Sequence, residues 1–148
     1  MLARPIQAGF DDPVLRSQQV FRRVLDAMSR PGSIHELDGL PTAAPGLSAA
    51  ATAICLTLLD FETPLWLDET AASAGDYLVF HCSAPLVQEK GDAAIAVIGA
   101  ASDIGELGAF CAGTDEHPET ATTLVIDVEG LYEGRGVELT GPGGSTQQ

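Results

Sequence analysis

The run Ala93-Ala-Ile-Ala-Val-Ile98 is apolar at every position, and Thr122-Thr-Leu-Val-Ile-Asp-Val128 is rich in β-branched residues. Both runs have the length of a β-strand, and β-branched residues favour strands. A strand with two apolar faces has to be covered on both sides, which is typical of layered domains. We therefore predict an α/β fold with a central, mixed β-sheet flanked by helices.

The segments on either side of these runs complete the predicted order. Asp12-Pro13 indicates a helix start, because Asp caps free backbone N–H groups and Pro suits the first helical position. Pro31-Gly32 ends this helix, so we expect it over 13–30. Further strands are predicted over 33–37, 64–67, 77–82 and 136–140, and further helices over 48–59 and from Ser102 or Asp103 to Phe110.

Length and composition favour one domain over residues 1–148. The chain has 148 residues, of which 45% are hydrophobic, enough to fill a single core. Its 21 acidic residues against 7 basic ones give a formal net charge of -14. This charge opposes binding to nucleic acid and to an anionic membrane surface. The N-terminus does not resemble a signal peptide, and no run of about 20 apolar residues exists, so we expect a cytoplasmic protein.

The residues that could support catalysis do not fall into a known motif. The sequence contains no phosphate-binding loop of the P-loop or G-x-G-x-x-G type and no G-x-S-x-G elbow. Cys55, Cys82 and Cys111 are far apart, which favours buried free thiols over disulfides or a zinc site. His81 and Cys82 would point to opposite faces of the predicted strand, so we do not expect a nucleophile–base pair. We predict no catalytic residue, no metal site and no cofactor.

The first predicted helix carries a basic stripe. Arg16, Arg23 and Arg30 are spaced by seven residues, and a helix drifts by only about 20° over such a step. The stripe could bind an acidic partner or a phosphorylated ligand, or it could pair with acids of the same domain. His81 completes this candidate partner or anion surface, although a structural histidine is the alternative. The apolar residues at helical spacing, which predict an amphipathic helix, are Val14, Phe21, Leu25 and Met28.

Four segments carry a resemblance to a known family. Phe21-Arg-Arg-Val-Leu-Asp-Ala-Met-Ser-Arg-Pro-Gly32 is similar to the pattern F-R-x-x-[LM]-x-A-M-[SA]-x-P-G, a helix followed by a turn. The other segments are Leu56-Thr-Leu-Leu-Asp60 with Thr63-Pro-Leu-Trp-Leu67, Phe80-His-Cys-Ser-Ala-Pro-Leu86, and Gly113-Thr-Asp-Glu-His-Pro-Glu119 leading to Leu139-Thr-Gly-Pro-Gly143. In this order they resemble the PhnH family of the bacterial carbon–phosphorus lyase system.

The resemblance implies a role in phosphonate catabolism. In this family the H subunit works with the G, I and L subunits to join a phosphonate to the ribose of ATP. The step displaces adenine and leaves a ribosyl alkylphosphonate triphosphate. The G, H, I and J subunits form a core complex, and isolated H is a homodimer. We therefore expect a non-catalytic partner subunit; the alternative is a chain that contributes a phosphonate- or nucleotide-binding site shared with another subunit.

The resemblance also implies a fold like the large domain of pyridoxal-phosphate-dependent transferases. Enzymes of that kind need a lysine for the Schiff base. The only lysine is Lys90, in the polar segment Gln88-Glu-Lys-Gly91, so we expect no pyridoxal phosphate. Family members are expected to continue for about 45–50 residues past the position of Gly143, and a shorter chain would leave a sheet edge open.

Overall fold

The predicted apolar runs at 64–67, 93–98 and 122–128 form the sheet. The computed structural model describes residues 5–100, 103–134 and 136. Within them the strands are β1 (Leu65–Leu67), β2 (Ile95–Ile98) and β3 (Thr123–Ile126), in the order β1-β2-β3. Both strand pairs are parallel, so the mixed sheet predicted from the sequence is parallel throughout the described residues. The parallel pairing requires a crossover connection between successive strands.

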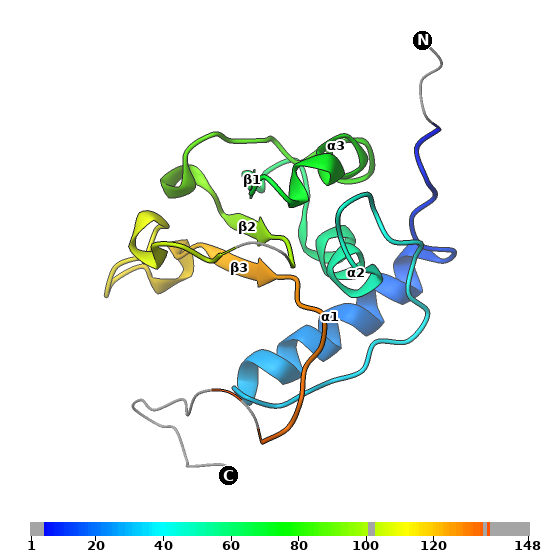
Figure 1. Cartoon of the computed structure of the whole chain (residues 1–148), viewed down its shortest axis with the longest axis horizontal. Coiled ribbons are helices and arrows are strands. Elements are labelled where there is room, and N and C mark those ends of the chain that lie inside the picture. The colour runs from blue at the N-terminus through cyan, green and yellow to red at the C-terminus, as the bar shows by residue number, and fades with distance from the viewer. Residues whose placement is uncertain (1–4, 101–102, 135, 137–148) are drawn as a thin grey trace.

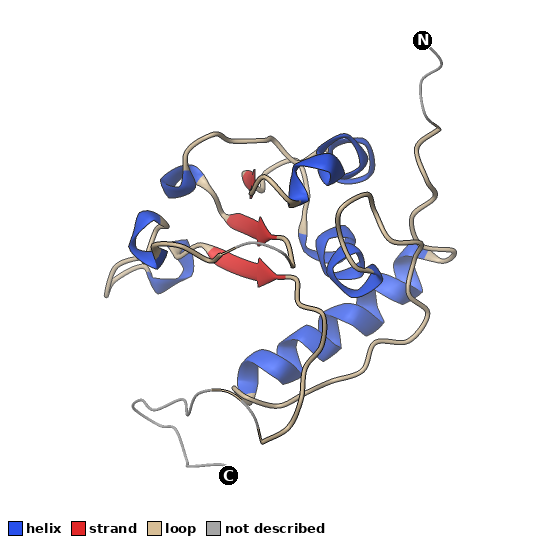
Figure 2. Cartoon of the chain, in the orientation of Figure 1, coloured by secondary structure: helices blue, strands red, loops and turns tan. Residues whose placement is uncertain are grey.

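Three α-helices group together on one side of the strands (Figures 1 and 2). They are α1 (Pro13–Ser29), α2 (Ala49–Leu58) and α3 (Gly75–Cys82). The α1 and α2 helices confirm the predictions for 13–30 and 48–59, and side-chain caps begin both. Asp12 accepts a hydrogen bond from the Leu15 N–H at 3.1 Å, and Ser48 accepts one from the Ala51 N–H at 3.1 Å. None of the described helices combines the length and apolar character needed to cross a membrane.

The first face of the sheet packs against α2 and α3. Every residue of β2 is buried, which fits a central strand between two covered faces. Alternate residues of the three strands point to this first face, in register across the sheet. The residues that form this core include Leu65, Ile95, Val97 and Val125 from the strands, Ala51 and Cys55 from α2, and Leu78 from α3.

The second face is covered by an aromatic cluster. Phe110 packs with Ala96 and Ile98, and its ring meets Trp66 edge-on at a centroid distance of 5.6 Å. The Nζ atom of Lys90 lies 5.1 Å from the centroid of Trp66 and 5.3 Å from that of Phe110. Such distances allow cation–π attraction, so Lys90 covers the sheet even though its neighbours in the sequence are polar.

The strand predicted over 77–82 is wrong, because Gly75–Cys82 is the α3 helix. A short 3-10 turn, Ala71–Ala74, leads directly into it, and Ser83, with φ 57°, ends it. Tyr77 and Leu78 are buried. A short apolar run fits a helix or a strand equally well by periodicity alone. On a helix, neighbouring residues such as His81 and Cys82 are about 100° apart, so the opposite-face argument for this pair does not apply.

Two other predicted elements differ from the structure. Residues 33–37 form an irregular segment, and the helix expected to end at Phe110 is reduced to the 3-10 turn Leu107–Ala109 in the described residues. Gly105, at φ 65°, adopts a left-handed conformation that a continuous helix does not accommodate. Ser102 and the predicted strand residues 137–140 lie outside the described residues.

Two aspartates bind backbone groups at the carboxyl ends of the strands. Asp68 follows β1, and its Oδ1 accepts hydrogen bonds from the N–H groups of Ala71 at 2.7 Å and Gly99 at 3.2 Å. Asp127 follows β3, and its Oδ2 accepts one from the Ser48 N–H at 2.7 Å. Asp127 is only 8% exposed. These carboxylates join the end of the sheet to the start of α2 and to the segment that leads into α3.

Replacing Asp127 with Ala should lower the free energy of unfolding by about 1–3 kcal/mol, because the Ser48 N–H loses a buried acceptor. Asp127→Asn keeps an acceptor oxygen and should lose less. Urea unfolding monitored by the fluorescence of Trp66, the only tryptophan, measures the change. Glu129→Ala removes a nearby exposed carboxylate and is the matched control. An equal loss in both Ala variants would contradict the assigned role of Asp127.

Candidate functional site: the surface of helix α1

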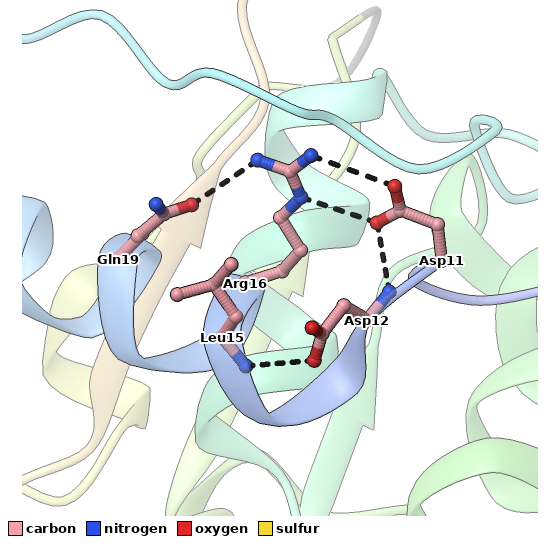
Figure 3. Close-up of polar contacts among 5 residues, drawn as sticks. All are labelled: Asp11, Asp12, Leu15, Arg16 and Gln19. Carbon is pink, nitrogen blue, oxygen red and sulfur yellow. Dashed lines mark hydrogen bonds and ion pairs between the residues drawn. The ribbon is translucent and has the colours of Figure 1, made fainter.

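Arg16 begins the predicted basic stripe and is engaged within the chain (Figure 3). Its Nε donates to Asp11 Oδ1 at 3.1 Å, and its Nη1 donates to Gln19 Oε1 at 3.2 Å. The hydrogen bond from Arg16 is the main reason that the pKa of the Asp11 carboxyl is lowered, and the same contact raises the pKa of Arg16. A Cβ at Gly39 would collide with the Arg16 guanidinium, and Gly39 has φ 61°. Gly39 therefore provides the space that Arg16 occupies.

The other arginines of α1 divide into two kinds. Arg30 forms an exposed ion pair with Asp26 at 3.7 Å. Arg22 and Arg23 form no ion pair with any described residue, and both line a shallow groove of about 310 Å³. Pairing within the chain therefore accounts for Arg16 and Arg30, while Arg23 stays available for a ligand or partner. The groove also contains Gln19, Val20, Asp26, Leu37 and Asp38.

His81 lies on α3 and is absent from the lining of that groove. Its Nε2 is 2.9 Å from the carbonyl oxygen of Gln7, and its ring lies against that of Tyr77, tilted by 50°, at a centroid distance of 4.4 Å. Phe80 packs edge-on at 5.0 Å. These contacts favour the structural interpretation of His81, which holds the segment before α1 against α3. The proposed surface of Arg16, Arg23, Arg30 and His81 is thus not gathered into one groove.

The apolar stripe of α1 is exposed, contrary to the usual orientation of an amphipathic helix. Val20 is the one residue of α1 that is buried, and it is not part of the stripe. The α1 helix packs against α2, and Val20 is 2% exposed. The exposed fractions of the stripe residues are 75% for Val14, 46% for Phe21, 52% for Leu25 and 65% for Met28. Helical periodicity identified the stripe, but only the packing shows that it faces outward.

All three cysteines are free thiols, as predicted, but of the three expected to be buried only Cys55 is, and Cys82 and Cys111 are half-buried. Cys55 is buried, and desolvation raises its pKa from 9.0 to about 12. Cys82 is half-buried, and desolvation raises its pKa from 9.0 to about 11. The nucleophilic form of cysteine is the thiolate, so burial suppresses the reactivity of both groups.

The sequence did not lead us to predict a structural role for Asp68 and Asp127, the carboxylates at the end of the sheet. Ligands of open α/β sheets commonly bind at this end, but Asp68 Oδ1 and Asp127 Oδ2 accept hydrogen bonds from backbone N–H groups of the chain itself. The other oxygen of Asp68, Oδ2, is buried without a hydrogen-bond partner among the described residues. The signal in the sequence is an Asp placed at the end of an apolar run. In the part of the chain that the structure describes, no group of three or more His, Cys, Asp or Glu could hold a metal ion.

The fold and the α1 surface define a small α/β protein with an exposed, partly basic helix. The PhnH family, described as bacterial phosphonate metabolism protein, matches residues 8–148. A Rhizobium meliloti (strain 1021) protein named alpha-D-ribose 1-methylphosphonate 5-triphosphate synthase subunit PhnH is 35% identical over 137 residues. The match covers 91% of this chain and 68% of that protein. The chain therefore belongs to the PhnH family.

Replacing Arg16 with Gln should raise the pKa of Asp11 towards its ordinary value of 3.8, because the hydrogen bond from Arg16 is lost. Because the pKa of Asp11 is lowered in the folded state, its contact with Arg16 stabilises the fold above pH 3.8. This stabilisation is lost as the pH falls through the lowered pKa. NMR titration of the Asp11 carboxyl measures the shift. Arg23→Gln is the control and should leave Asp11 unchanged; a pKa that stays low in Arg16→Gln would refute the assignment.

Cys55 and Cys82 should resist alkylation by iodoacetamide in the folded protein at about pH 8, because their thiolates are scarce. Unfolding in urea removes the desolvation and should make both thiols react. Peptide mass spectrometry identifies the labelled residues. If Cys55 were labelled as fast in the folded protein as in urea, its assigned burial would be incorrect.

Proposed function

We propose that this chain is a subunit of a carbon–phosphorus lyase system in phosphonate catabolism. The observation that supports the proposal most directly is membership of the PhnH family over residues 8–148. The Rhizobium relative, 35% identical, is named as a subunit of a synthase, which favours a subunit role here as well. The exposed apolar stripe of α1 is consistent with this role, because exposed apolar patches are typical of protein interaction sites.

The reaction that the chain would support is transfer of a phosphonate to the ribose of ATP. Adenine leaves, and the product is a ribosyl alkylphosphonate triphosphate. We propose that the G, I and L subunits share this step, that G, I and J are partners in a core complex, and that the chain has a structural rather than a catalytic part. We also propose one domain over 1–148, a cytoplasmic location and a homodimer when the chain is isolated.

The family resemblance extends to a fold like the large domain of pyridoxal-phosphate-dependent transferases, and we propose this likeness without the cofactor. A Schiff base requires an accessible lysine amine. The Nζ atom of Lys90 lies against the rings of Trp66 and Phe110, where it takes part in packing on the sheet. This position supports a structural role for Lys90.

A second candidate function is a contribution to a shared phosphonate- or nucleotide-binding site. Arg22 and Arg23 favour it, because both line one groove and have no ion pair among the described residues. Guanidinium groups bind phosphate and phosphonate oxygens well. Asp26 and Asp38 line the same groove and oppose an anion there. The structural role therefore remains the better supported of the two.

Co-expression of the tagged chain with its G, I and L subunits tests the proposed function. The subunits should co-purify, and the mixture should convert ATP and methylphosphonate into the ribosyl triphosphate product, followed by ³¹P NMR. A mixture without this chain should lose at least about tenfold in rate, equivalent to 1.4 kcal/mol.

Calorimetric titration of the chain alone with ATP and with methylphosphonate separates the two candidates. No heat of binding is expected for a purely structural subunit. Tight binding of either compound by the chain alone would overturn the structural role and support the shared site. Failure of the wild-type chain to co-purify with any of these subunits would contradict the proposed function itself.

A further inference from the structure

We propose that the apolar stripe of α1 is the docking surface for an amphipathic helix of another subunit, one that carries acidic residues beside its own apolar stripe. The inference rests on the proposed subunit function and adds the surface and the chemistry of the partner. The stripe consists of Val14, Phe21, Leu25 and Met28.

The geometry of the stripe fits a helical partner. At about 100° per residue the four side chains fall within an arc of about 60°, and from Val14 to Met28 the rise along the helix is about 21 Å. Val14, Phe21 and Met28 are spaced by seven residues, the repeat that matches the seam between two packed helices. A straight apolar strip of this kind is recognised by the apolar face of a second helix. No side chain of the stripe is buried by the described residues.

The charges of α1 select an acidic partner. Arg22 lies beside the stripe, about 60° from Leu25 around the helix axis, whereas Arg23 lies on the opposite side of the helix, about 180° from Val14. Arg16 and Arg30 already pair with Asp11 and Asp26, whereas Arg22 forms no ion pair with a described residue. Because Asp26 is paired with Arg30, Arg22 gives this flank of the stripe a positive charge, on a chain whose net charge is -14. A carboxylate on the partner would meet the guanidinium group of Arg22, and such pairing gives specificity and faster association.

A second copy of this chain fits the stripe less well. Two α1 helices packed antiparallel along their stripes would bring the flank that carries Arg22 against the same flank of the other copy, and like charges across an interface are unfavourable. An anionic membrane is also disfavoured, because the chain as a whole carries a net charge of -14. The partner that agrees with both the apolar and the basic residues is a polypeptide helix with apolar and acidic positions.

Photo-crosslinking in the assembled complex tests the surface. Benzoylphenylalanine is introduced in place of Phe21, and the full chain is co-expressed with its G, I and L subunits. The matched control places the same group at Phe61, which is 70% exposed in the turn after α2. We expect crosslinks from position 21 to one segment of another subunit that has apolar residues at helical spacing with Asp or Glu beside them, and no crosslink from position 61 to that segment. Crosslinks from position 21 to a second copy, to this chain itself or to nothing would overturn the inference.

Charge reversal gives an independent measurement. Arg22→Glu and Phe21→Ser should each weaken capture of that subunit at least about tenfold, and the loss in Arg22→Glu should shrink at high salt because salt screens exposed charges. Phe61→Ser is the control and should capture the subunit as the wild type does. Circular dichroism confirms that each variant is folded, and the exposed position of Arg22 keeps its variant informative if Phe21→Ser does not fold.

The two proposals fail in different ways. If Arg22→Glu and Phe21→Ser capture the subunit and support product formation as the wild type does, the α1 stripe is not the docking surface. The proposed subunit function would still stand. If the wild-type chain neither captures a subunit nor supports product formation, the proposed subunit function is wrong.

Discussion

Burial of the central strand is the constraint on which the rest of the structure depends. β2 is buried at every residue and pairs in parallel on both sides. Parallel strands need crossover connections and cover on both faces. The α2 and α3 helices cover one face, and Trp66, Phe110 and Lys90 cover the other.

The carboxyl end of the sheet shows how polar groups complete that arrangement. Asp68 and Asp127 accept backbone hydrogen bonds where the strands stop, and so connect the sheet to α2 and to the turn before α3. Buried backbone N–H groups need acceptors, and a side-chain carboxylate supplies one where no strand or helix does. These acidic residues, which a chain of net charge -14 offers in abundance, serve the fold at this edge.

The α1 helix differs from the other two because its packing leaves its most apolar stripe outside. Val20 faces the interior, while Phe21, Leu25 and Met28 are exposed. On the same helix, Arg16 and Arg30 form ion pairs near the two ends. Arg22 and Arg23, in the middle, form no ion pair with a described residue. An exposed apolar stripe beside the guanidinium group of Arg22, which has no ion pair among the described residues, suits a protein partner, in keeping with a subunit of a larger assembly.

The sequence by itself determined the elements with strong local signals. Asp12 and Ser48 cap helices through short-range hydrogen bonds, and the apolar or β-branched runs around Ile95 and Val125 form strands. The family also followed from the sequence, because its motifs are contiguous. Residues 77–82 could not be assigned locally, since Tyr-Leu-Val-Phe-His-Cys suits either a helix or a strand, and the preceding turn and the packing of Leu78 selected the helix. The pairs of Arg16 with Asp11 and of Arg30 with Asp26 are local, since each joins residues four or five positions apart. Only the tertiary structure decided which side of α1 is exposed, because this depends on how α1 packs against α2.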